Sequence, residues 1–400
     1  MIDSRVARTV AVLGVLGTFT GCADDSARAS LPSAEYSERD SAGARIVTAS
    51  GDALSTFLPW VVDSVPDLEL GAVDGDPRFQ FHRIRGIVGL SDGGFIVVDG
   101  ASRELRWFTA SGGHVRSVGG SGQGPGEFMD PLLVPRYLAD SLLIYDRMRR
   151  AFTWVAADGS GVRSHSPGGP LFNGTPTTSA GGRAVFGSVS GSTSCPENAP
   201  CELPLALRWV DVAGAAADTL MIHPIRMLRY TQSGPPVLVT GPLDQKNVGA
   251  AGPAGPVLPG DPRFELRQFD ADGRLVSILR VDAPPRMTPD DALDAYVQRA
   301  PDPRELRGVY ELMGLPETVP AFQAIRVDHL GWYWAELFRP GEDATAEWLV
   351  FDADGRARGI VELPGRLEVH DIGEAYILGR WTNDLDVESV RRYPLDRRGT

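Results

Sequence analysis

Lysine, cysteine and long apolar runs are all scarce in this chain. Lys246 is the only lysine among 39 basic residues, while the acidic residues number 52, so the formal net charge is −13. An acidic chain without a basic stripe repels the phosphates of nucleic acid, and we expect no nucleic-acid partner. The apolar run at residues 10–16 is too short to cross a bilayer as a mature helix. The composition therefore argues against nucleic-acid binders and against proteins with several membrane-spanning helices.

Several catalytic signatures are also missing. None of the six histidines forms a His-x-x-x-His pair, and no Gly-x-Ser-x-Gly segment occurs. The glycine-rich residues 119–126 lack the Lys-Ser/Thr pair of a phosphate-binding loop. The sequence therefore predicts no catalytic residues and no cofactor. A divalent metal stays open, because a site that collects ligands from distant segments leaves no local signature.

A short phrase recurs along the chain and indicates the fold. Residues 269–274 and 351–356 both read Phe-Asp-Ala-Asp-Gly-Arg, and looser copies stand at 108–112, 155–159 and 210–214. Each copy lies between alternating apolar runs, which is typical of a tight turn between two strands. A calcium loop would need a third acidic ligand and a distal Glu, and both are missing. Repeats at this spacing favour a propeller or a solenoid.

The repeats divide residues 44–400 into units of about four strands. In the first unit, residues 84–90 form the inner strand and residues 95–99 the next. We predict an all-β fold, a six-bladed β-propeller with a small helical insertion; seven blades is the alternative. The last unit lacks an outer strand, and we expect residues 68–71 to supply it. That pairing would close the ring and remove exposed strand edges.

Three insertions interrupt these units, at residues 188–204, 241–262 and 283–320. The second is rich in Gly, Pro and Ala and is predicted to be a loop. In the third, Thr288 is predicted to cap one helix, and a second helix over 302–313 carries an apolar stripe. The two helices are either a lid or docking pair, or a strut packed on the propeller.

The amino terminus has the three-part pattern of a secretory signal over residues 1–21. Residues 19–22 read Phe-Thr-Gly-Cys and resemble a bacterial lipobox, which implies that Cys22 carries lipid and anchors the protein to a membrane. The alternative is an ordinary secretory signal with an incidental cysteine. Residues 22–43 are rich in Ser, Ala, Asp and Glu and are predicted to be a disordered tether. We expect an exported protein of the bacterial cell envelope, on its periplasmic or surface face.

The two remaining cysteines are Cys195 and Cys201. In an oxidising compartment they would close a small loop as a disulfide. The alternative is a two-cysteine metal site, but no histidine or third cysteine lies nearby in the sequence. The disulfide prediction therefore agrees with export.

The inter-unit segment 119–128 (Gly-Gly-Ser-Gly-Gln-Gly-Pro-Gly-Glu-Phe) resembles the connection between blades of NHL-repeat propellers. The whole of residues 66–397 is similar to that six-bladed pattern. Residues 351–356, 361–364 and 377–388 also resemble a group of bacterial envelope propellers of uncharacterised function. The resemblance implies a fold and not an activity.

Aromatic and charged residues gather at two places in the last two units. They alternate along one predicted strand and crowd the final turn, and aromatics beside charges can form a binding rim. These candidate ligand-binding residues are Trp332, Trp334, Glu336, Arg380, Trp381, Asp384 and Asp386. The alternative is that they pack between blades and brace the closure of the ring.

We therefore expect a lipid-anchored envelope propeller that acts as a binding or assembly scaffold for a protein or small-molecule ligand. Binding would occur at one mouth of the ring, framed by residues 241–261 and 288–313. The alternative is a metal-dependent propeller enzyme, lactonase-like or lyase-like, that hydrolyses or eliminates in the central channel. A third interpretation is a structural partner in an envelope complex. Convergent acidic or histidine side chains in the channel would favour the enzyme.

Overall fold

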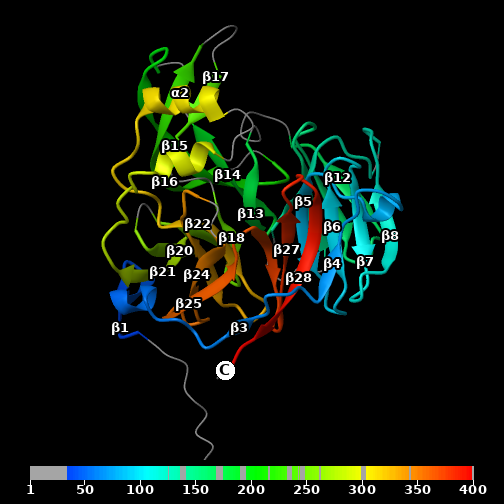
Figure 1. Ribbon diagram of the computed structural model, residues 1–400, viewed down its shortest axis with the longest axis horizontal. Helices are drawn as coiled ribbons and strands as arrows, with labels where there is room; N and C mark the ends of the chain where they lie inside the picture. Colours follow the sequence, from blue (N-terminus) through cyan, green and yellow to red (C-terminus); the bar gives the residue numbers. More distant parts are fainter. Residues whose placement is uncertain are drawn as a thin grey trace, which may run out of the picture.

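The computed structural model describes residues 34–398 apart from several short gaps, and this part of the chain is mainly β-structure arranged in six sheets (Figure 1). The gaps are 125, 136–140, 168–173, 190–194, 215–216, 232–236, 242, 244–247, 261–262, 299–302 and 342–343. The all-β prediction is confirmed. No helix among the described residues is long and apolar enough to cross a membrane.

The first two sheets each contain four antiparallel strands in chain order, so neighbouring strands are joined by short turns. The strand predicted at residues 95–99 is buried at every position, as expected for a strand covered on both faces. The first sheet comprises β5 (Ile84–Gly89), β6 (Phe95–Asp99), β7 (Glu104–Phe108) and β8 (His114–Gly119). The second comprises β9 (Pro131–Val134), β10 (Ser141–Asp146), β11 (Ala151–Ala156) and β12 (Val162–His165).

The third sheet has a fifth strand and extends beyond the others. Its strands are β13 (Pro176–Ala180), β14 (Arg183–Val189), β15 (Pro200–Asp211), β16 (Ala217–Tyr230) and β17 (Val237–Thr240). β15 and β16 extend beyond the end of β14, and their ends project from the sheet together with β17. We call this projection, residues 200–204, 224–230 and 237–240, the arm. Residues 200–204 of the predicted first insertion form the start of β15 and lie in this projection, and residues 237–240, which sequence alone would place in the fourth unit, pair with β16 in the third sheet.

The fourth sheet shows that the loop predicted for the second insertion, residues 241–262, was wrong in part. Its inner strands, β18 (Ala250–Ala251) and β19 (Pro256–Pro259), lie within residues 241–262, which were expected to form only a loop. Both strands are buried throughout, and their residues give no alternation of apolar and polar positions. The sheet continues through β20 (Glu265–Phe269) and β21 (Leu275–Asp282).

An N-terminal hairpin adds two strands to the outer edge of the fourth sheet. β2 (Ala44–Ser50) pairs in parallel with β21, and β1 (Tyr36–Ser41) pairs with β2. The disordered tether predicted over residues 22–43 therefore ends earlier, because residues 36–41 form a strand. All six side chains of β1 are exposed, so backbone pairing rather than burial holds it. The signal segment and Cys22 lie outside the described residues.

The fifth and sixth sheets complete the set, and the sixth joins the two ends of the chain. β4 (Leu68–Leu70) pairs antiparallel with β28 (Glu388–Asp396), as predicted for residues 68–71, and β3 (Val61–Val62) pairs with the end of the same strand. The fifth sheet is β22 (Phe322–Val327), β23 (Tyr333–Leu337), β24 (Thr345–Phe351) and β25 (Ala357–Pro364). The sixth is β26 (Leu367–Ile372), β27 (Tyr376–Thr382) and β28 (Glu388–Asp396), with β4 (Leu68–Leu70) and β3 (Val61–Val62); short 3₁₀ turns lie at η1 (Gly51–Leu54) and η2 (Pro77–Phe79).

The inner strands of the six sheets contact one another in a closed cycle. β5 contacts β9, and the series continues through β13, β18, β22 and β26 back to β5. They approach closely: a side chain at Gly86 of β5 would place its Cβ 2.3 Å from the Cβ of Leu133 on β9. Hydrophobic clusters fill the spaces between neighbouring sheets; one cluster joins Phe95 of the first sheet to Leu378 of the sixth. The sheets therefore form a closed propeller ring.

The two ends of the ring differ in their connections. The recurring Asp-Gly phrases lie at one end, where they join the third and fourth strands of their sheets; at 270–273, the Gly273 amide donates to the Asp270 carbonyl at 3.0 Å. The prediction of hairpin turns is confirmed. We call this the turn end. The opposite end, which carries the links from one sheet to the next, is called the connecting end.

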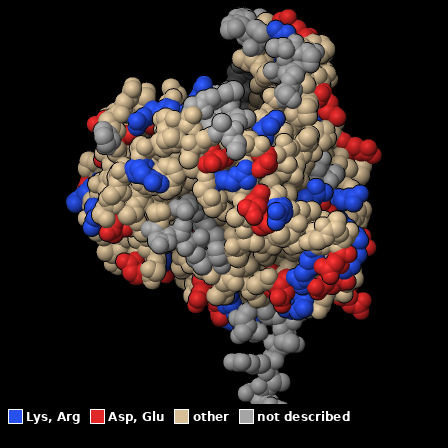
Figure 2. All heavy atoms as spheres, turned by 180° about the vertical axis from the view of Figure 1, so that it is seen from behind, with Lys and Arg blue, Asp and Glu red and all other residues tan. Residues whose placement is uncertain are grey.

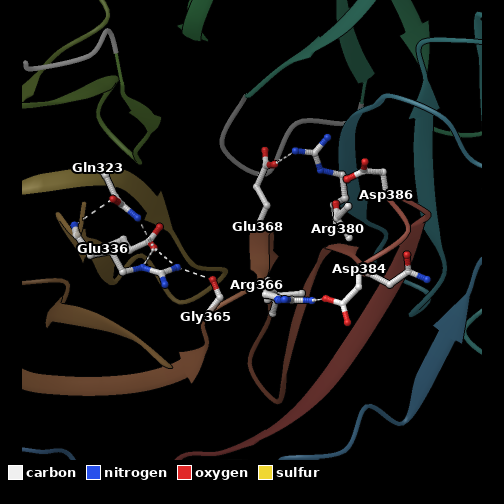
Figure 3. Close-up of a pocket in the computed structure, with 12 residues that line it drawn as sticks. Gln323, Glu336, Gly365, Arg366, Glu368, Arg380, Asp384 and Asp386 are labelled. Atoms are coloured by element: carbon white, nitrogen blue, oxygen red, sulfur yellow. Dashed lines mark hydrogen bonds and ion pairs between the residues drawn. The ribbon is translucent and has the colours of Figure 1, made fainter. Parts of the chain in front are cut away.

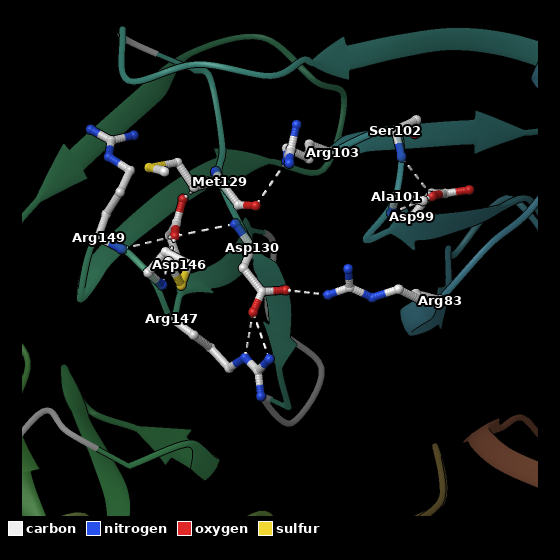
Figure 4. Close-up of polar contacts among 11 residues, drawn as sticks. Arg83, Asp99, Ala101, Ser102, Arg103, Met129, Asp130, Asp146, Arg147 and Arg149 are labelled. Atoms are coloured by element: carbon white, nitrogen blue, oxygen red, sulfur yellow. Dashed lines mark hydrogen bonds and ion pairs between the residues drawn. The ribbon is translucent and has the colours of Figure 1, made fainter. Parts of the chain in front are cut away.

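Buried aspartates shape the connecting end (Figure 4). Asp99, at the end of β6, accepts the amides of Ala101 and Ser102 in the following turn at 2.9 and 3.0 Å. Asp146, at the end of β10, accepts the Met129 amide at 2.7 Å and so holds the link from the first sheet to the second. Each carboxylate replaces water at backbone groups that would otherwise be unsatisfied.

The helical insertion packs against the arm. α2 (Pro303–Met313) lies beside β16, and α1 (Ala292–Val297) contacts α2 (Figure 1). Val309, Tyr310 and Met313 of α2 are buried in one cluster with Leu228 of β16. Thr288 does not cap α1, because its hydroxyl donates to the Pro316 carbonyl at 2.6 Å instead. The apolar stripe predicted for the second helix is thus used in packing. A disulfide joins Cys195 to Cys201 beside the start of β15.

Candidate functional site

A pocket of about 510 Å³ opens at the connecting end, between the fifth and sixth sheets (Figure 3). Strands β22 and β23 line one side, and β26, β27 and the β27–β28 turn line the other. Seven of the twelve lining side chains are charged, four acidic and three basic. The lining residues are Gln323, Glu336, Arg339, Gly365, Arg366, Leu367, Glu368, Arg380, Thr382, Asn383, Asp384 and Asp386.

The side formed by the fifth sheet is centred on Glu336. Its Oε1 accepts from the Gln323 amide at 2.7 Å and from the Arg339 guanidinium at 3.3 Å. Arg339 also donates to the Gly365 carbonyl, which ties the two sheets together. Only 9% of Glu336 is exposed, and this burial raises its pKa despite the nearby arginine. Glu336 is therefore easier to protonate than an ordinary glutamate.

The side formed by the sixth sheet carries Glu368 and Arg380. The Arg380 guanidinium pairs with Glu368, and its other branch lies 2.8 Å from Oε1 of Glu388. Desolvation would raise the pKa of Glu368, but His370, Arg380 and Arg326 together lower it. The pocket thus holds two carboxyl groups whose environments shift their pKa values in opposite directions.

The mouth of the pocket is formed by the β27–β28 turn. Asp384 pairs with Arg366, and 81% of the Asp384 side chain is exposed. Asn383 accepts the amides of Leu385 and Val387 at 2.9 and 3.0 Å and so fixes the turn. Asp386 has a positive φ of 57°, a strained conformation that aspartate tolerates better than most residues. The two aspartates are exposed charges at the mouth, together with Arg366 and Glu368.

The inner strand β26 of the same region carries a histidine, His370, whose side chain is only 14% exposed. The pairing of β26 with β27 shifts register between Val369 and Asp371, so His370 lies in a β-bulge. Burial, the largest effect, lowers the pKa of His370 to about 4. His370 is therefore neutral at pH 7, even with Glu368 only 3.6 Å away.

The structure brings four of the seven predicted ligand-binding residues together in this pocket: Glu336, Arg380, Asp384 and Asp386. The three tryptophans lie elsewhere. Trp334 is fully buried, and Trp332 packs 5.3 Å from Trp60. Trp381 stacks on Arg391, whose guanidinium lies 4.2 Å from the ring centre. Bracing of the ring, the alternative interpretation, accounts for Trp332 and Trp334.

Sequence reasoning missed six polar residues of the pocket: Thr382 and Asn383 beside the β27–β28 turn, and Gln323, Arg339, Arg366 and Glu368 on other segments. Gln323 and Glu368 lie near the connecting ends of the inner strands β22 and β26, and Arg339 and Arg366 follow the ends of β23 and β25. If the ends of these strands had been predicted correctly, their shared position at the connecting end would have indicated Gln323, Glu368, Arg339 and Arg366.

The acidic residues of the pocket are mostly engaged by arginines. Glu336, Glu368 and Asp384 each pair with a guanidinium. Among the described residues, no group of three or more His, Cys, Asp or Glu side chains is arranged to hold a metal ion. The divalent metal of the sequence analysis stays a prediction, and the alternative Cys195–Cys201 metal site is replaced by the disulfide.

Comparison with known proteins defines no family for this chain. No family model matches it, and no curated protein matches it. Similar solved structures include a putative exported protein from Bacteroides fragilis, with 9% identity over 88% of this chain and 99% of the other and a TM-score of 0.46. Virginiamycin B lyase from Staphylococcus aureus shows 10% identity over 84% and 99%, with a TM-score of 0.39. Regucalcin, a calcium-binding protein from Agrobacterium tumefaciens, shows 9% over 79% and 91%, with 0.34. These similarities assign no activity to this chain.

Proposed function

We propose that this protein is an exported, lipid-anchored propeller of the cell envelope, of the six-bladed NHL type, and that it acts as a binding or assembly scaffold. Its ligand contacts the pocket between the fifth and sixth sheets. The disulfide supports an oxidising compartment outside the cytoplasm. The lipobox resemblance at Cys22 supports attachment to the membrane.

One observation carries the binding role: charged side chains from two sheets converge on one pocket and are held in place by one another. Arg339 bridges Glu336 and Gly365, while Arg380 bridges Glu368 and Glu388. A polar surface already fixed in position loses little freedom when a ligand binds. Because acidic and basic groups alternate around the pocket, it suits a ligand with both donors and acceptors.

The position of the pocket favours a large partner as well as a small one. The arm and α1 lie at the same end of the ring: Ala292 of α1 packs in one cluster with Phe338, next to the pocket residue Arg339. The back view in Figure 2 shows acidic and basic side chains interspersed, with no broad patch of one sign. Contacts confined to one end of the ring would leave the rest of the surface free.

A pair of charge reversals tests this role. Asp384 at the connecting end and Asp354 at the turn end are both exposed, 81% and 67%, and both lie near an arginine. Asp384→Arg should shift the protein from larger envelope complexes to the free form on a native gel. Asp354→Arg should leave the distribution unchanged. Equal distributions for both variants and the wild type would contradict the proposal.

A metal-dependent enzyme remains the second candidate, because one observation favours catalysis. Glu336 has a raised pKa and Glu368 a lowered one, the separation expected of a general acid and a general base. Thermal unfolding after chelation, with each common divalent ion added back, separates the candidates. An ion bound at 100 times its dissociation constant stabilises the fold by about 2.7 kcal/mol. The scaffold hypothesis predicts that no ion shifts the unfolding temperature. A shift that Glu368→Gln abolishes would favour the enzyme.

A further inference from the structure

We propose that Arg85, on the inner strand β5, forms with its arginine neighbours a subsite for an oxyanion at the connecting end of the ring. The group bound would be a carboxylate or phosphate of the ligand. This inference rests on the binding function proposed above and names the chemistry of one part of that ligand. The subsite lies on the first and second sheets, beside the pocket already described.

Arg85 is a cation without a partner. No hydrogen bond or ion pair joins its side chain to any other described residue, and its Nε atom is buried. The residue lies where β5 and β6 shift register between Ile84 and Ile87, and such bulges re-aim side chains. A buried donor without an acceptor costs free energy, so its presence calls for an explanation.

The surrounding groups increase this cost. Arg83 and Arg147 lie close enough to Arg85 to repel it, and so does Arg380 from the sixth sheet. Burial, the largest effect, and these three cations lower the pKa of Arg85. The local charge is therefore strongly positive in a chain whose net charge is −13.

The nearby Asp130 carboxylate attracts Arg85 and opposes the lowering of its pKa, but it makes no hydrogen bond to Arg85, because Arg83 and Arg147 occupy both of its oxygens (Figure 4). Oδ1 of Asp130 accepts from Arg83 at 3.0 Å, and Oδ2 accepts from Arg147 at 2.7 Å. Arg380 is likewise engaged, by Glu368 and Glu388. Three guanidiniums at 83, 85 and 147 thus share a single carboxylate, which leaves an excess of two positive charges.

An oxyanion would satisfy these groups. A guanidinium presents its donors as a planar fork that matches two oxygens of a carboxylate or phosphate, and charge-assisted bonds of this kind are about twice as strong as neutral ones. Arg83 and Arg147 keep exposed fractions of 55% and 41%, so they can turn toward a bound anion. Arg380 connects the two regions, because it lines the pocket and also repels Arg85.

The test is calorimetric titration of the full mature chain with inorganic phosphate and, separately, with acetate, at constant ionic strength. The wild type should bind at least one of them, and the preferred probe distinguishes a tetrahedral from a planar group. Arg85→Met should weaken binding at least tenfold, about 1.4 kcal/mol. Arg39→Met is the matched control: Arg39 is an exposed arginine on β1 without a partner among the described residues, and its loss should leave the affinity unchanged.

A second readout separates ligand binding from a structural role. Without anion, Arg85→Met should unfold at a higher temperature than the wild type, because it removes a partly buried charge that lies near other cations. Phosphate or acetate should no longer stabilise this variant. A lower unfolding temperature without anion, or equal affinities for Arg85→Met and the wild type, would overturn the proposal. So would equal losses in Arg85→Met and Arg39→Met, or failure of both probes to bind the wild type.

One further variant keeps the two proposals distinguishable. Asp384→Arg changes the pocket between the fifth and sixth sheets but not the subsite, so phosphate or acetate should still bind it. Loss of the envelope complexes with retained anion binding supports both proposals. If Asp384→Arg keeps the envelope complexes and only Arg85→Met loses anion binding, the subsite is supported and the scaffold is contradicted.

Discussion

The guanidinium of Arg397 lies 2.8 Å from the carboxylate of Asp328, and the two side chains are only 6% and 0% exposed. The same carboxylate accepts the indole N–H of Trp334 at 2.9 Å and the Trp332 amide at 2.8 Å. Arg397 also stacks 4.9 Å from the ring centre of Trp60. A residue near the end of the chain is thereby fixed between the N-terminal segment and the fifth sheet, which reinforces closure of the ring.

Asp328→Asn should therefore lower the free energy of unfolding strongly. The change leaves Arg397 buried without its counter-charge, and breaking such a pair typically costs about 3–5 kcal/mol. Asp396→Asn is the control, because Asp396 and Arg398 form an exposed pair at 2.8 Å. Exposed pairs contribute about 1 kcal/mol or less. Denaturant unfolding of both variants checks the comparison, and similar losses would contradict a closing role for Asp328.

His370 should make the fold sensitive to acid. Its folded-state pKa of about 4 lies below the ordinary value of 6.5, so the folded state favours the neutral ring. The stability that this provides is complete above about pH 6.5 and is lost as the pH falls through 6.5 toward 4. The groups that act on the ring are Glu368, Asp371, Arg326 and Arg380.

His370→Gln should flatten this part of the stability profile, by up to about 3 kcal/mol between pH 7 and 4. His329→Gln is the contrasting variant. The Asp371 carboxylate raises the pKa of His329, so its contribution is present below about pH 6.5 and is lost as the pH rises through the raised value. Denaturant unfolding at several pH values distinguishes them. An unchanged acid slope in His370→Gln would be the contrary result.

The disulfide should stabilise the third sheet to a modest degree. Cys195 and Cys201 are six residues apart, and closing so short a loop contributes about 2 kcal/mol. The double variant Cys195→Ala/Cys201→Ala should unfold earlier than the wild type under oxidising conditions. A reductant should lower the unfolding temperature of the wild type and leave that of the double variant unchanged. Equal sensitivity to reductant would contradict this account.

Cys22 should decide where the protein fractionates. Cys22→Ala removes the residue that the lipobox resemblance marks for lipid, and a chain without lipid loses its membrane affinity. The variant should move from the membrane fraction to the soluble envelope fraction. If it stays with the membrane, the lipid anchor is wrong.

Strand patterns and turn chemistry made most of the ring predictable. The Asp-Gly turns and buried runs such as Phe95–Asp99 follow directly from alternation and from glycine in tight turns. The inner strands Ala250–Ala251 and Pro256–Pro259 could not be predicted, because two alanines and two prolines give no periodic signal. β1 was not predicted for the opposite reason: its residues are all exposed, and only backbone pairing defines it.

The site was predictable only where its residues are close in sequence. Arg380, Asp384 and Asp386 surround one turn, and Glu336 lies in a strand whose residues alternate. Arg366 and Glu368 reach the pocket because the link between the fifth and sixth sheets passes there. Arg85 could not be singled out, since its lack of a partner depends on how Arg83 and Arg147 share Asp130.

The central claim is that the connecting end near the pocket contacts a partner in the envelope. The most direct measurement places a photo-crosslinking amino acid at position 384 or at position 354 of the full-length protein in intact cells. Both positions are exposed, and they lie at opposite ends of the ring. The account predicts discrete crosslinked products from position 384 and none from position 354. Products from position 354 alone, or the same products from both positions, would contradict it.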